Sequence, residues 1–304
     1  MITVAGEALI DLVVDRSDAV SAHLGGGPFN VARIAGMLEA PCRFVGRFGD
    51  DAFAHRLRAA LDRLHVAVAA GEPTSAPTTL AVAELDGDGT ARYKFHLVGT
   101  SAAQLLPEDI APDALADAAA IATGGLALIA EPTASTVFGL LVQAPPTATV
   151  VLDPNCRPSA ALEPARYPAM VRRFLPHVDI VKCSVGDLRV LEPRVDAGMA
   201  AQRLLALGPR AVLVTDGPAP ICIYTAGSER AVAVEPVPVI DTVGAGDALL
   251  AGLLAWWVRE GVARERTADI EALTEGVSAA VQVARAACTV AGANLPDTFA
   301  WRWR

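Results

Sequence analysis

The chain has 304 residues, which is enough for one large α/β domain or two ordinary ones. Hydrophobic residues make up 53% of it and charged residues 19%, a balance that supports a sizeable core and argues against disorder. The net charge of −9 disfavours binding to nucleic acid, because a phosphate backbone would be repelled.

The cysteines and the apolar stretches indicate where the protein works. The five cysteines form no Cys-x-x-Cys pair and no Cys/His ligand spacing, so free thiols in a reducing cytosol are expected. The N-terminal residues lack a basic region followed by an apolar core, so no signal peptide is expected. The longest apolar stretch, residues 248–258, is too short to span a bilayer. These features predict a cytoplasmic protein without a membrane partner.

The N-terminal residues predict two strands and a helix. Residues 2–5 read as a buried strand that ends at Gly6 and Glu7, and alternation resumes over residues 9–14. Asp11 interrupts that alternation, so it is either a turn residue or a ligand to something polar. Three glycines and Pro28 then open a helical period, with Asn30 in the first turn, where it could cap neighbouring amides.

A strand and turn, a helix and a hairpin are expected next. Residues 44–51 predict the strand and turn, and residues 52–64 predict the helix. Residues 78–85 and 92–97 alternate on either side of Asp86-Gly-Asp-Gly89, which is a hairpin turn signal. On its own, this hairpin predicts only a surface element.

From residue 100 onward, short apolar runs alternate with helical ones. Strands are expected at residues 119–121, 149–152, 180–181, 211–215 and 221–224. This alternation predicts βαβ units and a mostly parallel sheet covered by helices. Ligands bind at the carboxyl ends of the strands in such sheets, so the polar residues that follow each run are the candidates.

Three segments carry such residues. Asp153-Pro-Asn-Cys-Arg-Pro158 follows one strand. It is either a turn stabilised by its Asp and Asn, or a segment whose Arg157 binds the charge of a substrate or transition state. Lys182, Ser184 and Asp187 follow the next strand, and Thr215-Asp-Gly217 the one after it.

The stretch from Pro236 to Trp256 combines three features. Val237 to Ile240 predict a short strand, Gly244-Ala245-Gly246 lets backbone N–H groups approach a ligand, and a buried helix is expected from Asp247 onward. A small-residue turn before a buried helix is an anion site. An acid beside it is a helix-stabilising residue, or the base that takes a proton from a hydroxyl attacking a phosphoryl group.

Two other nucleotide-binding patterns are missing from the sequence. No Gly-x-x-x-x-Gly-Lys-[Ser/Thr] segment occurs, which excludes a P-loop kinase. No Gly-x-Gly-x-x-Gly turn opens the first βα unit, which disfavours a dinucleotide dehydrogenase.

Two long motifs resemble a known family. Asp241-Thr-Val-Gly-Ala-Gly-Asp247 resembles the C-terminal signature of the ribokinase-like sugar kinases, also called the PfkB family. The loop at Gly26, Gly27, Pro28, Asn30 and Ala32 resembles the other signature, Gly-Gly-x-Pro-x-Asn-x-Ala. Weaker matches lie between residues 46 and 292 in the family's order. The set of Asp11, Gly26, Gly27, Asn30 and Arg157, together with the wording of the segment from Asp153 to Pro158, resembles the fructokinase branch most.

The family resemblance has two departures. Ser184 and Asp187 stand where the family has Asn-x-x-Glu, and Ala54 stands where it often has Gly. The resemblance implies a ribokinase-like α/β three-layer sandwich, with a mostly parallel central sheet and a small β-sheet lid. The whole chain, 1–304, would be one domain, with the lid inserted at about 11–22 and 78–98.

The resemblance also assigns roles. It makes Asp247 the catalytic base and the Gly244, Ala245 and Gly246 amides the anion hole, with Arg157 holding substrate or transition-state charge. Sugar binding falls to Asp11, Gly26, Gly27, Asn30 and either Phe95 or His96. ATP binding falls to Lys182, Ser184, Thr215, Gly217, Gly244, Gly246, Thr289 and Gly292. Asp187 would contact Mg²⁺ through water, and the backbone of Asp241 and Val243 would bind a monovalent cation such as K⁺.

The function expected is an ATP-dependent sugar kinase that phosphorylates a primary hydroxyl, with fructose as the favoured substrate. Ribose, 2-keto-3-deoxygluconate and nucleosides remain alternatives, because pocket shape decides among them. A sugar- or nucleotide-binding protein without catalysis is the alternative from another class, and only Ser184 and Asp187 favour it. Lid hairpins of this family pair between subunits in some members and cover the site of a monomer in others, so the sequence leaves open whether this protein forms a homodimer.

Overall fold

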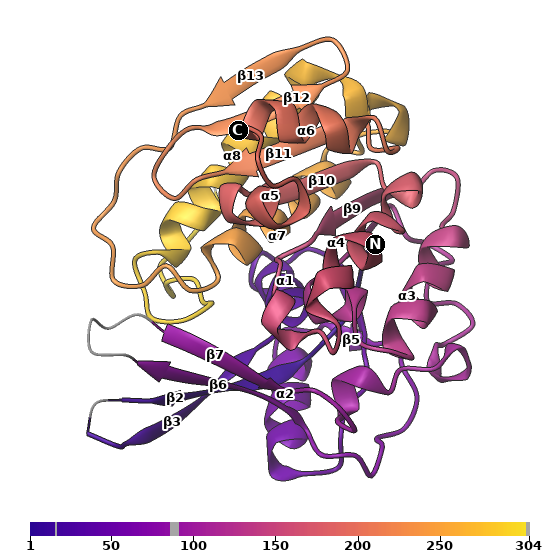
Figure 1. Cartoon of the computed structure of the whole chain (residues 1–304), viewed down its shortest axis with the longest axis vertical. Coiled ribbons are helices and arrows are strands. Elements are labelled where there is room, and N and C mark those ends of the chain that lie inside the picture. Colours follow the sequence, from indigo (N-terminus) through magenta and orange to yellow (C-terminus); the bar gives the residue numbers. More distant parts are fainter. Residues whose placement is uncertain (16, 86–90, 302–304) are drawn as a thin grey trace.

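The computed structural model describes residues 1–15, 17–85 and 91–301 of the chain, which form one large and one small sheet (Figure 1). Among these residues, the large sheet has nine strands in the order β13-β12-β11-β10-β9-β8-β1-β4-β5. Its strands run parallel from β11 to β5, and β12 and β13 are antiparallel additions at one edge. The strands are β1 (Ile2–Ala5), β4 (Cys42–Val45), β5 (Ala67–Val68), β8 (Ala120–Gly124), β9 (Thr149–Asp153), β10 (Ile180–Ser184), β11 (Ala211–Thr215), β12 (Ile221–Thr225) and β13 (Glu229–Val232).

Helices cover both faces of the large sheet. Successive strand residues alternate between two cores, as Val150 and Val151 do on β9. One core includes residues of α1 (Gly27–Met37), α2 (Ala52–Asp62), α7 (Ala245–Arg259) and α8 (Ile270–Ala287). The other includes residues of α3 (Thr133–Val142), α4 (Tyr167–Arg172), α5 (Val185–Leu191) and α6 (Ala197–Leu205). The predicted three-layer α/β sandwich is confirmed.

The small sheet projects from the sandwich at the lower left of Figure 1. Its order is β3-β2-β6-β7, with β2 (Leu9–Val14), β3 (Val20–Gly25), β6 (Thr79–Leu85) and β7 (Ala91–His96). Two antiparallel hairpins meet along the parallel pair of β2 and β6. Its first segment runs from Leu9 to Gly25, which is longer at both ends than the expected residues 11–22. The predicted turn at Asp86 to Gly89 lies outside the described residues.

The strand expected from Val237 to Ile240 is wrong. This segment is irregular, and Val239 and Ile240 are 60% and 69% exposed. The prolines at positions 236 and 238 have no N–H to donate to a ladder, so β-branched neighbours are not enough to make a strand. The segment is instead held by the end of α8, since the amide of Ile240 donates to the carbonyl of Cys288 at 2.8 Å.

Candidate active site

A cavity of about 470 Å³ lies where the carboxyl ends of the parallel strands meet the starts of α1 and α7. The small sheet supplies part of its wall through β2 and β7. The structure brings most of the predicted site residues together here, as expected for the carboxyl edge of a parallel sheet. Those that line the cavity are Asp11, Gly26, Gly27, Asn30, Phe95, Arg157, Lys182, Ser184, Asp187, Thr215, Val243, Gly244, Gly246 and Asp247.

Helix α7 begins with a left-handed turn at Gly244. Gly244 is its N-cap at φ 78°, and a Cβ there would lie 2.4 Å from the Cβ of Ala293. Glycine offers no side chain to cap the first turn, which leaves backbone N–H groups and the positive end of the helix dipole facing the cavity. The amide of Ala245 donates to the carbonyl of Thr242 at 3.2 Å, which tightens the turn.

We expect Gly244→Ala to destabilise the fold by about 2–4 kcal/mol, because it adds both a left-handed alanine and a clash with Ala293. Chemical denaturation would measure the change. Gly139→Ala is the matched control: Gly139 lies inside α3, and a Cβ there would meet no atom within 4 Å. It should stabilise the protein by up to about 1 kcal/mol. Equal effects of the two changes would contradict the strained turn.

Asp247 lies in the first turn of α7 and is only 8% exposed. Its Oδ2 accepts a hydrogen bond from Nδ2 of Asn30 on α1 at 2.9 Å, so Asn30 does not cap its own helix. Burial raises the pKa of Asp247 to about 7, the hydrogen bond from Asn30 opposes this, and the charge of Asp153 adds to it. A carboxylate with a pKa close to neutral suits a general base better than an ordinary aspartate does.

A buried ion pair lies beneath the anion site. Nζ of Lys182 donates to Oδ2 of Asp153 at 2.7 Å, and both side chains are less than 10% exposed. Burial lowers the pKa of Lys182, but the charge and hydrogen bond of Asp153, together with the charges of Asp247 and Asp187, hold the pKa above its ordinary value. A Cβ on Gly246 would lie 2.7 Å from this Nζ, so the ammonium sits directly against the glycine turn. Lys182 therefore places its positive charge at the start of α7.

Ser184 and Asp187 form the N-cap of α5. Oγ of Ser184 accepts the amide of Asp187 at 3.0 Å, and Oδ2 of Asp187 accepts the amide of Ser184 at 2.7 Å. Oδ1 of Asp187 accepts the amide of Cys156 at 2.6 Å. Both carboxylate oxygens thus accept backbone N–H groups, which leaves room for contact with a metal only through remaining lone pairs or water.

Arg157, in the loop after β9, and Asp11, on β2 of the small sheet, both line the cavity. Asp11 lies inside β2 opposite His23 on β3, so its interpretation as a turn residue is wrong. Burial raises the pKa of Asp11 to about 6, although the charges of His23 and Arg157 lower it. The amide of Arg157 donates to the hydroxyl of Tyr167 at 2.8 Å, and its Nη1 donates to the carbonyl of Cys156. The turn after Asp153 is also present, since Oδ1 of Asp153 accepts the amide of Asn155.

Other predicted residues lie outside this cavity. Asp241 joins two loops, because its carboxylate accepts the amides of Val243 at 3.0 Å and Gly292 at 2.8 Å. Thr289 lines a second cavity of about 800 Å³ between β13 and α8. Gly217 lies in the turn after β11 with φ 52°, and His96 points to the face of β7 that does not line the main cavity.

The sequence profile described as pfkB family carbohydrate kinase matches residues 1–299. The chain belongs to the pfkB family of carbohydrate kinases. The resemblance of the two signature motifs is therefore confirmed, and the protein is an ATP-dependent sugar kinase.

Curated relatives and solved structures of this family match nearly the whole chain. A fructokinase from Rhizobium leguminosarum bv. trifolii is 31% identical over 91% of this chain and 86% of its own. A fructokinase from Klebsiella pneumoniae is 32% identical over 86% of this chain and 85% of its own. A structure of Xylella fastidiosa fructokinase with bound ATP is 27% identical and covers 96% of this chain and 93% of its own, with a TM-score of 0.89.

In this pfkB kinase, eight residues that line the cavity carried no role in the predicted site: Glu7, Leu9, Tyr93, Gly125, Leu126, Asp153, Asn155 and Thr242. Glu7 follows β1 with only Gly6 between them, so the strand-end rule that selected Arg157 could have found it. Tyr93 shares a strand face with Phe95, and their rings stack 6.1 Å apart. Asp153 was visible only as a turn residue, because sequence spacing does not show its pairing with Lys182. No helix within the described ranges is long and apolar enough to cross a membrane.

Proposed function

We propose that this kinase is a fructokinase that transfers the γ-phosphoryl group of ATP to a primary hydroxyl of fructose. One observation supports the chemistry above all. Buried Asp247, with its pKa raised to about 7, lines the main cavity at the start of α7, where no side chain caps the helix. The substrate is supported by the fructokinase names of the curated relatives. A Vibrio cholerae O395 fructokinase structure with fructose, ADP and calcium bound, 26% identical with a TM-score of 0.82, supports it further.

In the proposed mechanism, Asp247 removes the proton from the attacking hydroxyl. Asn30 fixes the orientation of this carboxylate. The Gly244, Ala245 and Gly246 turn and the Lys182 ammonium stabilise the negative charge that develops on the transferring group. Arg157 balances charge on the side of the cavity that faces Asp11. Positioning and electrostatics thus supply the rate enhancement, as phosphoryl transfer requires.

The residues present fit ATP with Mg²⁺. Mg²⁺ takes few protein ligands and uses substrate phosphates and water for the rest. Asp187 would hold it through water, since both of its oxygens already accept backbone N–H groups. When bound, Mg²⁺ neutralises phosphate charge. Ser184, Thr215, Gly217, Thr289 and Gly292 would contact the nucleotide. The backbone of Asp241 and Val243 would hold K⁺.

A panel assay tests the function directly. ATP turnover with Mg²⁺ would be followed as ADP release with fructose, ribose, 2-keto-3-deoxygluconate, glucose and adenosine. Fructose should give the highest kcat/KM. Preference for another acceptor would keep the kinase and overturn the substrate. Sugar binding by calorimetry without turnover on any acceptor would instead support a protein that binds sugar without catalysis.

The pH profile tests the base. Only the ionised form of Asp247 can accept a proton, so kcat/KM should rise with pH, reach half of its maximum near pH 7 and level off above that. Burial also raises the pKa of Glu7 to about 7, and the charge of Asp247 contributes to that rise. The rising part of the pH profile therefore reports the titration of the two interacting carboxylates together. A profile that is flat between about pH 5 and 8 would contradict Asp247 as the base.

The cysteines bear on where the enzyme works. All five are free thiols, and three of them, at positions 42, 156 and 183, are buried. Free cysteines are usual in a reducing compartment. We therefore place the proposed activity in the cytoplasm.

A further inference from the structure

Glu7 is a buried acid on the wall of the sugar cavity. It follows β1 at the carboxyl edge of the large sheet and is only 3% exposed. A carboxylate buried in this way is costly unless hydrogen bonds compensate it. Glu7 has no role in the phosphoryl transfer proposed above, so its contacts need another explanation.

The carboxylate of Glu7 holds the backbone after β8. Its Oε2 accepts the amide of Ala127 at 3.1 Å, and hydrogen bonds from the amides of Leu126 and of Glu7 itself lower its pKa against the effect of burial. Its Oε1 fits only because position 125 is glycine: a Cβ on Gly125 would lie 2.3 Å from it. The carboxylate of Glu7 therefore occupies the space that a side chain at position 125 would need.

The main chain of Glu7 supports a second part of the wall. A Cβ on Gly26 would lie 2.6 Å from the carbonyl oxygen of Glu7, so the glycine loop before α1 packs directly on it. One residue thus contacts both the loop before α1 and the segment that follows β8. Both of these segments line the cavity.

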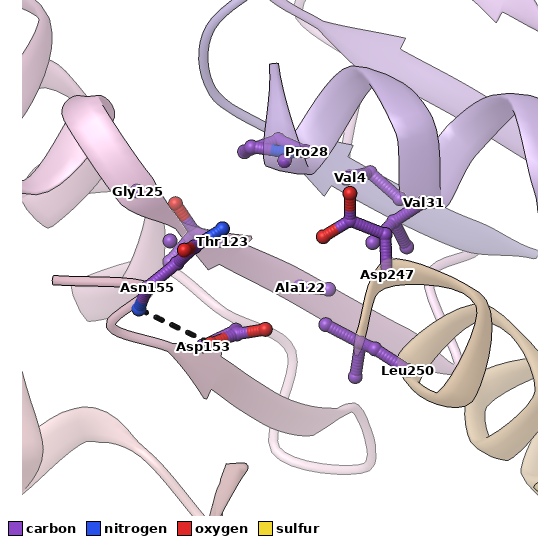
Figure 2. Close-up of a pocket in the computed structure, with 12 residues that line it drawn as sticks. Val4, Pro28, Val31, Ala122, Thr123, Gly125, Asp153, Asn155, Asp247 and Leu250 are labelled. Carbon is purple, nitrogen blue, oxygen red and sulfur yellow. Dashed lines mark hydrogen bonds between the residues drawn. The ribbon is translucent and has the colours of Figure 1, made fainter. Parts of the chain in front are cut away.

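Figure 2 shows a small pocket beside the cavity, and Gly125 and Asp247, which line both, lie on opposite sides of it. Gly125 and Leu126 therefore set the distance between the cavity wall and the catalytic base. A shift of that wall would change the position of a sugar hydroxyl relative to Asp247. Small misplacements of a substrate strongly lower the rate of reaction.

We propose that Glu7 is a positioning residue that fixes the Gly125–Ala127 backbone as the sugar-binding wall opposite Asp247. This inference rests on the proposed sugar kinase function. It predicts an effect on the sugar and not on ATP, because the segment after β8 lies on the side of the cavity away from the start of α7. A residue that merely stabilised the fold would affect both substrates alike or neither.

The test combines Glu7→Gln, Gly125→Ala and the double variant. Each single change should raise KM for the sugar about tenfold or more, since each disturbs the same buried charged hydrogen bonds. KM for ATP should stay within about twofold of the wild type. The double variant should be no worse than the poorer single one, because contacting residues that act through one structure are not additive.

Glu192→Gln is the matched control. Glu192 is also a buried carboxylate, 8% exposed, and it pairs with Arg172 away from the cavity. It should lower stability without changing KM for the sugar. An unchanged sugar KM in Glu7→Gln, an equal rise in both KM values, or additive single effects would each overturn the role of Glu7. Calorimetric sugar affinities give the same comparison without turnover, so failure of the kinase activity and failure of this role are separate results.

Discussion

Asp247→Asn should lower kcat by about 10²–10⁴-fold while leaving sugar affinity close to that of the wild type. Asparagine keeps the size of the side chain and an oxygen that can accept the Nδ2 hydrogen of Asn30, so the cavity should keep its shape. What it loses is the ability to take a proton at neutral pH. Single-turnover phosphoryl transfer and calorimetric sugar binding would separate the two effects.

The same change should make the protein more stable at high pH. The pKa of Asp247 rises on folding from 3.8 to about 7, so the folded state binds the proton more tightly than the unfolded state does. Stability from this group is present below about pH 4 and is lost as pH rises towards 7. Asparagine carries no such cost, so Asp247→Asn should be more stable than the wild type by about 2–4 kcal/mol near pH 8, with no gain near pH 4.

Asp196→Asn is the control for both measurements. Asp196 caps α6 through the amide of Met199 at 2.8 Å, and asparagine caps helices about as well. It should leave kcat unchanged and give no gain in stability near pH 8. Retained turnover in Asp247→Asn would remove Asp247 as the base, and reduced stability near pH 8 would show that the carboxylate is not held at a cost.

Residue pattern was enough to predict seven of the nine described strands of the large sheet, because strands buried on both faces leave continuous apolar runs, and it missed the edge strands β5 and β13. The runs at β9 and β11 were located to within one residue at each end. The failed strand at Val237 to Ile240 shows the limit of propensity. β-branched side chains favour a strand only where backbone donors and a partner strand are available, and the two prolines remove donors there.

The site residues likewise fall into those that local sequence predicts and those that depend on long-range contacts. Asp247, Asn30 and Arg157 lie in motifs whose spacing is visible along the chain, and the structure brings them into one cavity. Glu7 depends on contact with Gly125, more than a hundred residues away, and Lys182 depends on its pairing with Asp153. Such pairings come from strand order, which no local pattern encodes. Conversely, a local rule explains Ser184 and Asp187, because together they form a capping box.

Lys182→Met should cost about 3–5 kcal/mol of stability, because it leaves the Asp153 carboxylate buried without its partner. Burial already raises the pKa of Asp153, and the charge of Lys182 is what opposes this. Denaturant unfolding near neutral pH would measure the loss. The exposed pair of Arg230 and Glu271 is the matched control: Arg230→Met removes an ion pair of the same 2.7 Å length but should cost no more than about 1 kcal/mol.

Adding Asp153→Asn to Lys182→Met separates stability from catalysis. The double variant buries no unpaired charge, so it should regain most of the lost stability. It still lacks the ammonium beside Gly246, so kcat should remain about 10²-fold below the wild type or lower. Recovery of both quantities would mean that Lys182 serves only to neutralise Asp153. Recovery of stability alone would mean that the fold accepts the cost of a buried ion pair in order to hold a positive charge where the phosphoryl group is transferred.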